Sequence, residues 1–139
     1  MSTSVFHVLA KENSVSGGTG LNTGLALQPG QLLVLDVDPN ETWSAGAADR
    51  TSNANGLGNP LGGNFGLFTR GSQSFLYGAL VGSLDGGKTF FGVGTNLTMT
   101  VLTKGTLTLY YWDSNSGDNT GGVYVRANIY SGPTNVVQG

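Results

Sequence analysis

The sequence of 139 residues contains no cysteine and a single histidine, His7. No disulfide can therefore stabilise the fold, and no thiolate is available for catalysis or for binding a soft metal. The sequence therefore offers almost no residues from which a Ser-His-Asp or Cys-His catalytic arrangement could be built. His7 lies in an alternating segment, where a structural role is expected. We therefore expect a protein that is not an enzyme.

Charged residues are also scarce, at 10% of the chain against about 25% in an average domain. Six basic and eight acidic residues give a net charge of -2, so the sequence predicts no nucleic-acid partner. No apolar run approaches the roughly 20 residues of a membrane helix, which argues against membrane insertion. No basic stretch followed by an apolar one marks a classical signal peptide. We expect synthesis in the cytoplasm, with export or cell-surface display by a non-classical route left open.

Helical periodicity is missing as well, because 24 glycines interrupt nearly every window of the sequence. Alternating and continuous apolar segments instead predict about seven or eight short strands separated by turns. The predicted strands cover residues 6–10, 25–27, 32–37, 75–81, 88–93, 97–102, 106–112 and 123–130. The glycine-rich segment 49–65 is predicted to be a long surface loop. Together these features predict one all-β domain over residues 1–139, a β-sandwich or jelly roll.

The segment 113–122 between the last two predicted strands is rich in oxygen ligands. It places two carboxylates and two carboxamides within seven residues, namely Asp113, Asn115, Asp118 and Asn119. Calcium binds about six to eight such oxygens in flexible geometry, and the glycines of the segment allow carbonyls to turn inward. The segment is not an EF-hand, because strands flank it and Gly117 occupies a ligand position. The same residue types also form ordinary turns, so a bare hairpin loop is an alternative.

Four segments, taken in their order along the chain, resemble the PA-IL-like family of bacterial galactophilic lectins. These segments contain Pro29-Gly30 with Trp43-Ser44-Ala45-Gly46, Asp49-Arg50 with Asn55-Gly56-Leu57, Gly78-Ala79-Leu80-Val81, and Leu109-Tyr110-Tyr111-Trp112-Asp113 with Asp118-Asn119-Thr120-Gly121. The resemblance covers roughly residues 5–130. It implies a jelly-roll, galactose-binding-domain-like β-sandwich in which one Ca²⁺ per chain bridges the protein and sugar hydroxyls.

The resemblance also implies site residues by position. The implied calcium ligands are the side chains of Asp113, Asp118 and Asn119 and the carbonyls of Gly46 and Ser116, with Asn115 as the alternative to Ser116. The implied sugar contacts are Ser52, Asn55, Asp113 and Asn119. Trp43 and Trp112 each lie beside a proposed ligand segment and could pack on the apolar face of the sugar or equally be core residues. Alternation favours the non-core face for Trp112. Ser52 and Asn55 replace the histidine and glutamine with which the family contacts the exocyclic hydroxyl of galactose. Preference for galactose is therefore left open, although galactosides are the expected ligands.

The leading interpretation is thus a calcium-dependent lectin, and the alternative is a structural or assembly β-sandwich with a structural calcium or none. A glycoside hydrolase needs two carboxylates about 5–9.5 Å apart in a cleft, and the pair Asp36 and Asp38 more simply marks a strand end. Because one weak site per chain gains from multivalency, we expect a homo-oligomer, a dimer or tetramer. Its candidate interface contains Tyr124, Tyr130 and the tail 131–139.

Overall fold

The computed structural model describes residues 3–59 and 62–131, which are almost entirely β-structure. The strands are β1 (Thr3–Leu9), β2 (Leu21–Leu27), β3 (Leu32–Asp36), β4 (Trp43–Ser44), β5 (Thr51–Ser52), β6 (Leu67–Arg70), β7 (Gln73–Leu76), β8 (Leu80–Ser83), β9 (Phe91–Gly92), β10 (Asn96–Thr100), β11 (Gly105–Tyr111) and β12 (Thr120–Tyr130). A short 3-10 turn, η1 (Ala48–Arg50), precedes β5. Within the described residues, no helix is long and apolar enough to cross a membrane.

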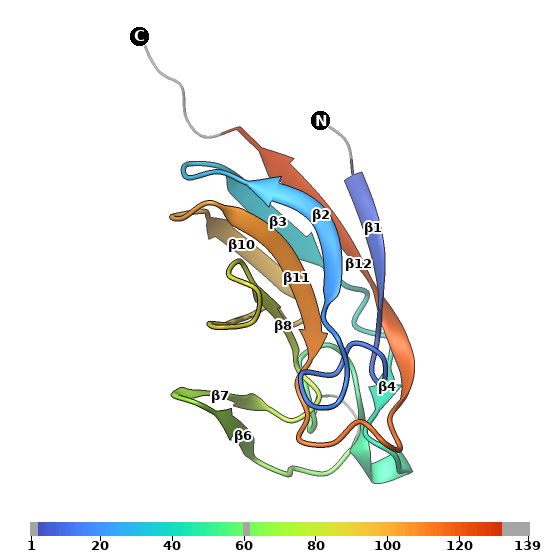
Figure 1. The fold of residues 1–139 in the computed structure, drawn as a ribbon. Helices are drawn as coiled ribbons and strands as arrows, with labels where there is room; N and C mark the ends of the chain where they lie inside the picture. The colour runs from blue at the N-terminus through green and yellow to red at the C-terminus, as the bar shows by residue number, and fades with distance from the viewer. Residues whose placement is uncertain (1–2, 60–61, 132–139) are drawn as a thin grey trace, which may run out of the picture.

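Two antiparallel sheets form the two layers of the molecule (Figure 1). One sheet has the order β10-β3-β12-β4-β5, with β1 paired to β12 beside this path, and the other has the order β2-β11-β8-β9. The chain crosses repeatedly between them, from β1 to β2 to β3 and later from β10 to β11 to β12. Such crossing connections are typical of jelly rolls. The all-β sandwich expected from the sequence is confirmed.

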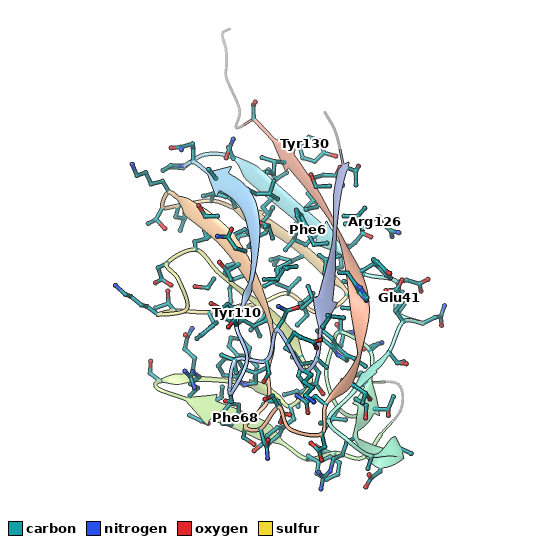
Figure 2. All side chains as sticks on the ribbon, turned by 45° about the vertical axis from the view of Figure 1, so that its right-hand side comes forward. Phe6, Glu41, Phe68, Tyr110, Arg126 and Tyr130 are labelled. Atoms are coloured by element: carbon teal, nitrogen blue, oxygen red, sulfur yellow. The ribbon has the colours of Figure 1, made fainter. Side chains whose placement is uncertain are left out.

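Strand alternation builds the core between the two sheets. On β12, Val123, Val125 and Ala127 are buried, whereas Tyr124 and Arg126 are exposed on the outer face. The inner face of β11 contributes its own buried side chains, and Phe6 of β1 packs against the same core (Figure 2). Because each fully buried aliphatic or aromatic side chain contributes about 1.5–3 kcal/mol, this inner layer is the main source of stability.

A second apolar cluster lies on the opposite face of β11 and is closed by the β6–β7 hairpin, which sits below β8 in Figure 1. Trp112 is fully buried in this cluster, and its Nε1–H donates to the carbonyl of Phe68 over 2.7 Å. The rings of Phe75 and Phe90 each lie 5.1 Å from the Trp112 ring. Alternation placed Trp112 off the main core face as expected, but the hairpin that covers it was not predicted.

The predicted strand 75–81 is interrupted in the structure. Strand β7 ends at Leu76 and β8 begins at Leu80, because Gly78 adopts φ +82 and turns the chain. The predicted loop 49–65 also contains the short strand β5 and the turn η1. Strand β5 pairs with β4, and β4 pairs with the start of β12. This pairing brings the segment between β4 and β5 to the end of the sandwich where β11 connects to β12 (Figure 1).

Candidate functional site

A cavity of about 400 Å³ opens at this end of the sandwich. Its walls come from the β4–β5 segment, the glycine-rich loop that follows β5, the residue after β7 and the β11–β12 loop. The lining residues are Ala45, Arg50, Leu57, Phe65, Tyr77, Asp113, Ser114, Asn115 and Asp118. Two carboxylates, one guanidinium and two aromatic rings therefore share one hollow.

Asp113 is the more buried of the two carboxylates, with 6% of its surface exposed. Burial raises the pKa of Asp113, and this effect outweighs the lowering by hydrogen bonds from the Ser114 N–H, the Asn119 side chain and the Asn115 N–H. The charge of Asp118 raises the pKa further. In the part of the chain that the structure describes, the only salt bridge joins Arg126 to Asp36. Asp113 is thus a largely desolvated carboxylate that forms no salt bridge with another described residue. A carboxylate in this state favours binding of a metal cation.

Asp118 is exposed and reaches the cavity from the far side of the same loop. Its carboxylate lies directly against Gly46, where a Cβ would stand only 2.6 Å from Asp118 Cγ. Gly46 has φ +123, a conformation that side-chain-bearing residues rarely adopt. The structure therefore brings together Gly46 and Asp118, which are far apart in the sequence, as the resemblance implied.

Asn119 is buried, with 2% of its surface exposed, and is not one of the residues that line the cavity. Its Nδ2 donates to the carbonyl of Ala10 over 2.9 Å, and this bond fixes which way the carboxamide points. Its Oδ1 is buried and accepts no hydrogen bond from residues 3–59 and 62–131. A buried amide oxygen without a donor is uncommon and costs free energy unless a cation or a water molecule satisfies it.

These donors fit calcium better than a transition metal. The described residues contain no group of three or more His, Cys, Asp or Glu side chains placed to hold a metal. A metal at Asp113 and Asp118 would therefore complete its shell with carboxamide and carbonyl oxygens, such as the unpaired Oδ1 of Asn119. All-oxygen shells of this kind suit hard cations, and the flexible geometry of a loop suits calcium more than magnesium.

Ser116 is placed differently from the other predicted ligands. Its side chain lines a separate, shallow hollow, where its Oγ lies against Gly17, and its carbonyl accepts the N–H of Asn119 over 3.2 Å. Asn115, by contrast, lines the main cavity beside Asp113. The structure thus brings Asn115, and not Ser116, to the wall of the cavity that Asp113 and Asp118 line.

Two predicted sugar contacts are core residues instead. Trp43 is 1% exposed, donates from Nε1 to the carbonyl of Gly78 over 2.9 Å, and packs edge-on against the Tyr111 ring at 4.5 Å. Ser52 is fully buried, and its Oγ donates to the carbonyl of Asn53. Both side chains face inward on the paired strands β4 and β5, so neither can touch a ligand in the cavity.

Asn55 is exposed but does not line the cavity. Its Oδ1 accepts the N–H of Thr95 over 2.8 Å and therefore ties the glycine-rich loop to the start of β10. Asn119, also predicted to touch sugar, is buried and does not line the cavity, so only Asp113 of the predicted sugar contacts does. The sequence did not reveal whether each of these side chains points inward or outward.

Of the six cavity residues that were not predicted as contacts, three carry a charged or an aromatic side chain: Arg50, Phe65 and Tyr77. Phe65 is 42% exposed, and the Cζ of Arg50 lies 5.7 Å from the centre of its ring. Tyr77 is held by stacking on the Phe68 ring at 5.5 Å. An aromatic residue inside a glycine-rich loop, as Phe65 is, was the one available signal, because such a loop offers little apolar surface to bury it.

No protein-family model and no curated protein matches the sequence. A solved structure described as the EclA N-terminal domain, a PllA-like lectin, matches the fold with a TM-score of 0.61 and 23% identity. The match covers 91% of this chain and 93% of that one. At this identity the match shows a shared β-sandwich fold, over nearly the whole length of both chains.

Proposed function

We propose that this protein is a calcium-dependent, non-catalytic lectin whose ligands are galactosides. The observation that carries the proposal is the buried Oδ1 of Asn119, which accepts no hydrogen bond from the described residues and belongs to the same loop as two carboxylates that line a cavity. The fold is shared with a protein described as a lectin, which supports carbohydrate as the ligand class. The resemblance to PA-IL-like lectins supports calcium and galactose.

In this proposal Asp113, Asp118 and Asn119 hold the ion, with carbonyl oxygens from the Gly46 and Asn115 segments. Bound calcium supplies coordination positions that two neighbouring sugar hydroxyls can take in place of water. The rings of Phe65 and Tyr77, in place of the Trp43 expected from the sequence, offer an apolar surface to the C–H face of a sugar. The polar groups of Ser114 and Asn115 can bind further hydroxyls.

The carboxylate pair considered from the sequence, Asp36 and Asp38, does not support a hydrolase mechanism. Asp36, one member of the carboxylate pair considered from the sequence, is bonded to Arg126, with a 2.8 Å hydrogen bond from Arg126 Nε. The other member, Asp38, accepts the N–H of Asn40 in a turn. Both of these carboxylates therefore serve structural roles, and this pair does not supply the acid and base of a hydrolase.

Titration calorimetry of the chelator-treated protein tests the metal. We expect one calcium per chain, no binding by Asp113→Asn and severely weakened binding by Asp118→Asn. The matched control is Asp38→Asn, which removes one acidic charge from an exposed turn and should bind as the wild type does. Absence of calcium uptake by the wild-type protein would refute the proposal.

Retention on immobilised galactose tests the ligand. We expect retention in calcium and release by chelator, whereas calcium uptake without retention on any sugar would indicate a structural ion in an assembly protein. Because Ser52 is buried, nothing replaces the family's contact to the exocyclic hydroxyl at that position. A neutral hydrogen bond contributes about 0.5–1.5 kcal/mol, so galactose and its 6-deoxy analogue should differ little in affinity.

Multivalency through association of identical chains is part of this proposal. Tyr124 and Tyr130 lie on the outer face of β12 and are 51% and 44% exposed, as an interface role requires. Of the tail 131–139, only Ser131 belongs to the described residues. Light scattering at micromolar concentration in calcium should give a mass above the 14.3 kDa of one chain, and a mass of one chain would contradict association.

A further inference from the structure

One basic side chain, Arg50, lines the cavity beside the two carboxylates. Its backbone is fixed on both sides, since its N–H donates to the carbonyl of Ala47 over 2.8 Å and its carbonyl accepts the N–H of Ala45 over 2.9 Å. Its guanidinium lies over the ring of Phe65, with Cζ 5.7 Å from the ring centre. A cation over an aromatic face keeps its N–H edges available, so this contact orients the guanidinium without using its donors.

Arg50 does not neutralise the carboxylates next to it. Within residues 3–59 and 62–131, neither Asp113 nor Asp118 forms a salt bridge with it. If Arg50 served to balance these acids, an ion pair would be the expected arrangement, because guanidinium and carboxylate match as bidentate partners. We therefore expect the guanidinium of Arg50 to bind a group other than these two carboxylates.

The charges around the cavity indicate what kind of group Arg50 would bind. A divalent cation would balance the charges of Asp113 and Asp118, and Arg50 at the cavity wall forms no salt bridge within the described residues, so its positive charge is left over. A neutral sugar cannot compensate this charge, whereas a carboxylate or sulfate group on the sugar can. Both anions accept two parallel N–H bonds from a guanidinium, and the partly enclosed cavity screens the attraction less than open water does.

We propose that the cavity selects saccharides that carry a negatively charged group, a carboxylate or a sulfate, and that Arg50 is the residue that binds this group. This inference rests on the proposed lectin function and specifies its ligand class. Phe65 then has two roles, as a support for Arg50 and as part of the apolar wall beside the sugar.

Competition binding in saturating calcium tests this inference. The ligands are methyl galactoside, galacturonate, and galactose sulfated at O3 or at O6, all measured at one fixed ionic strength. Wild-type protein should bind at least one anionic ligand about tenfold more tightly than the neutral galactoside, as expected for charge-assisted hydrogen bonds. Whether galacturonate or a sulfated sugar gains most identifies the anionic group.

Variants assign the preference to Arg50. R50Q should bring the ratio of anionic to neutral affinity close to one, and R50K should give an intermediate ratio because an ammonium lacks the planar fork. The matched control is R126Q, which removes a positive charge from the outer face of β12 and should keep the wild-type ratio. Urea unfolding and calcium titration of each variant show whether it is folded and loaded.

The outcomes separate the two proposals. A wild-type protein that binds methyl galactoside but shows no anionic preference refutes this inference and leaves the lectin standing. A preference that survives in R50Q also refutes it, because the charge would then be bound elsewhere. A protein that takes up no calcium and binds none of the four ligands refutes the lectin itself, and with it this inference.

Discussion

Gly46 offers the sharpest test of the site, because a methyl group there should act on calcium binding through Asp118. In Gly46→Ala the new Cβ would stand 2.6 Å from Asp118 Cγ, whereas ordinary contacts begin near 3.4 Å. The carboxylate must therefore retreat by about 0.8 Å. Asp118 is exposed, so it can move away without disturbing the core.

Gly46→Ala should have two separate effects, one on the stability of the fold and one on calcium affinity. The backbone at Gly46 has φ +123, and a non-glycine residue held in such a region costs about 1–3 kcal/mol of stability. Calcium–oxygen distances span only about 2.3–2.6 Å, so a carboxylate that retreats by most of an ångström is lost as a ligand. We therefore expect calcium affinity to fall at least about tenfold, which corresponds to about 1.4 kcal/mol.

A second glycine isolates the steric effect. Gly30 has φ +91, and a Cβ added there would meet no heavy atom of the described residues within 4 Å, so Gly30→Ala carries backbone strain without a clash. Urea unfolding in chelator should show comparable destabilisation of both variants, whereas calorimetry should show weakened calcium binding in Gly46→Ala alone. Equal calcium affinities in the two variants would refute the assignment of Asp118 as a ligand beside Gly46.

Three further predictions concern residues outside the proposed calcium site. Trp112→Phe removes the 2.7 Å bond to the Phe68 carbonyl and should cost about 1–3 kcal/mol in urea unfolding, and an unchanged unfolding curve would contradict the buried hairpin contact. Because Trp43 and Trp112 are both buried, saturation with sugar should leave the tryptophan fluorescence emission unchanged. A large shift of the emission maximum would indicate that Trp43 contacts the sugar after all. Hydrogen bonds from Thr89, Ser83 and Lys88 lower the pKa of Asp85 from 3.8 to about 2, so its stabilising effect is complete above pH 3.8 and is lost as the pH falls towards 2. Asp85→Asn should therefore flatten the dependence of unfolding free energy on pH in that range, and an identical slope in the variant would contradict this.

The strands that alternate regularly were predictable from the sequence. The inner side chains of β12, such as Val123 and Val125, and the outer ones, such as Tyr124, follow directly from the period of two residues in a strand. The β6–β7 hairpin was missed because its burial depends on a distant partner, the outer face of β11. Nothing local in the segment around Phe68 indicates that it covers Trp112.

The proximity of the proposed metal ligands was easier to predict from the sequence than the direction of the proposed sugar contacts. Asp113, Asp118 and Asn119 fall within one loop, so their proximity needs only the flanking strands to pair as predicted. The direction of Trp43 and Ser52 depends instead on which face of two-residue strands turns inward, and strands this short have no periodicity to read. Arg50 and Phe65 meet only because η1 and the glycine-rich loop fold against each other.

Strand β12 also determines how the cavity would be presented on a surface. It runs from Thr120, beside the cavity, to Tyr130, at the end of the sandwich where β1 begins (Figure 1). Eleven residues of extended chain span roughly 35 Å. A tether attached beyond Tyr130 would therefore hold the molecule by the end opposite its cavity. On a bead, an array or a fusion partner, the cavity would face outward, clear of the support by about the length of the domain.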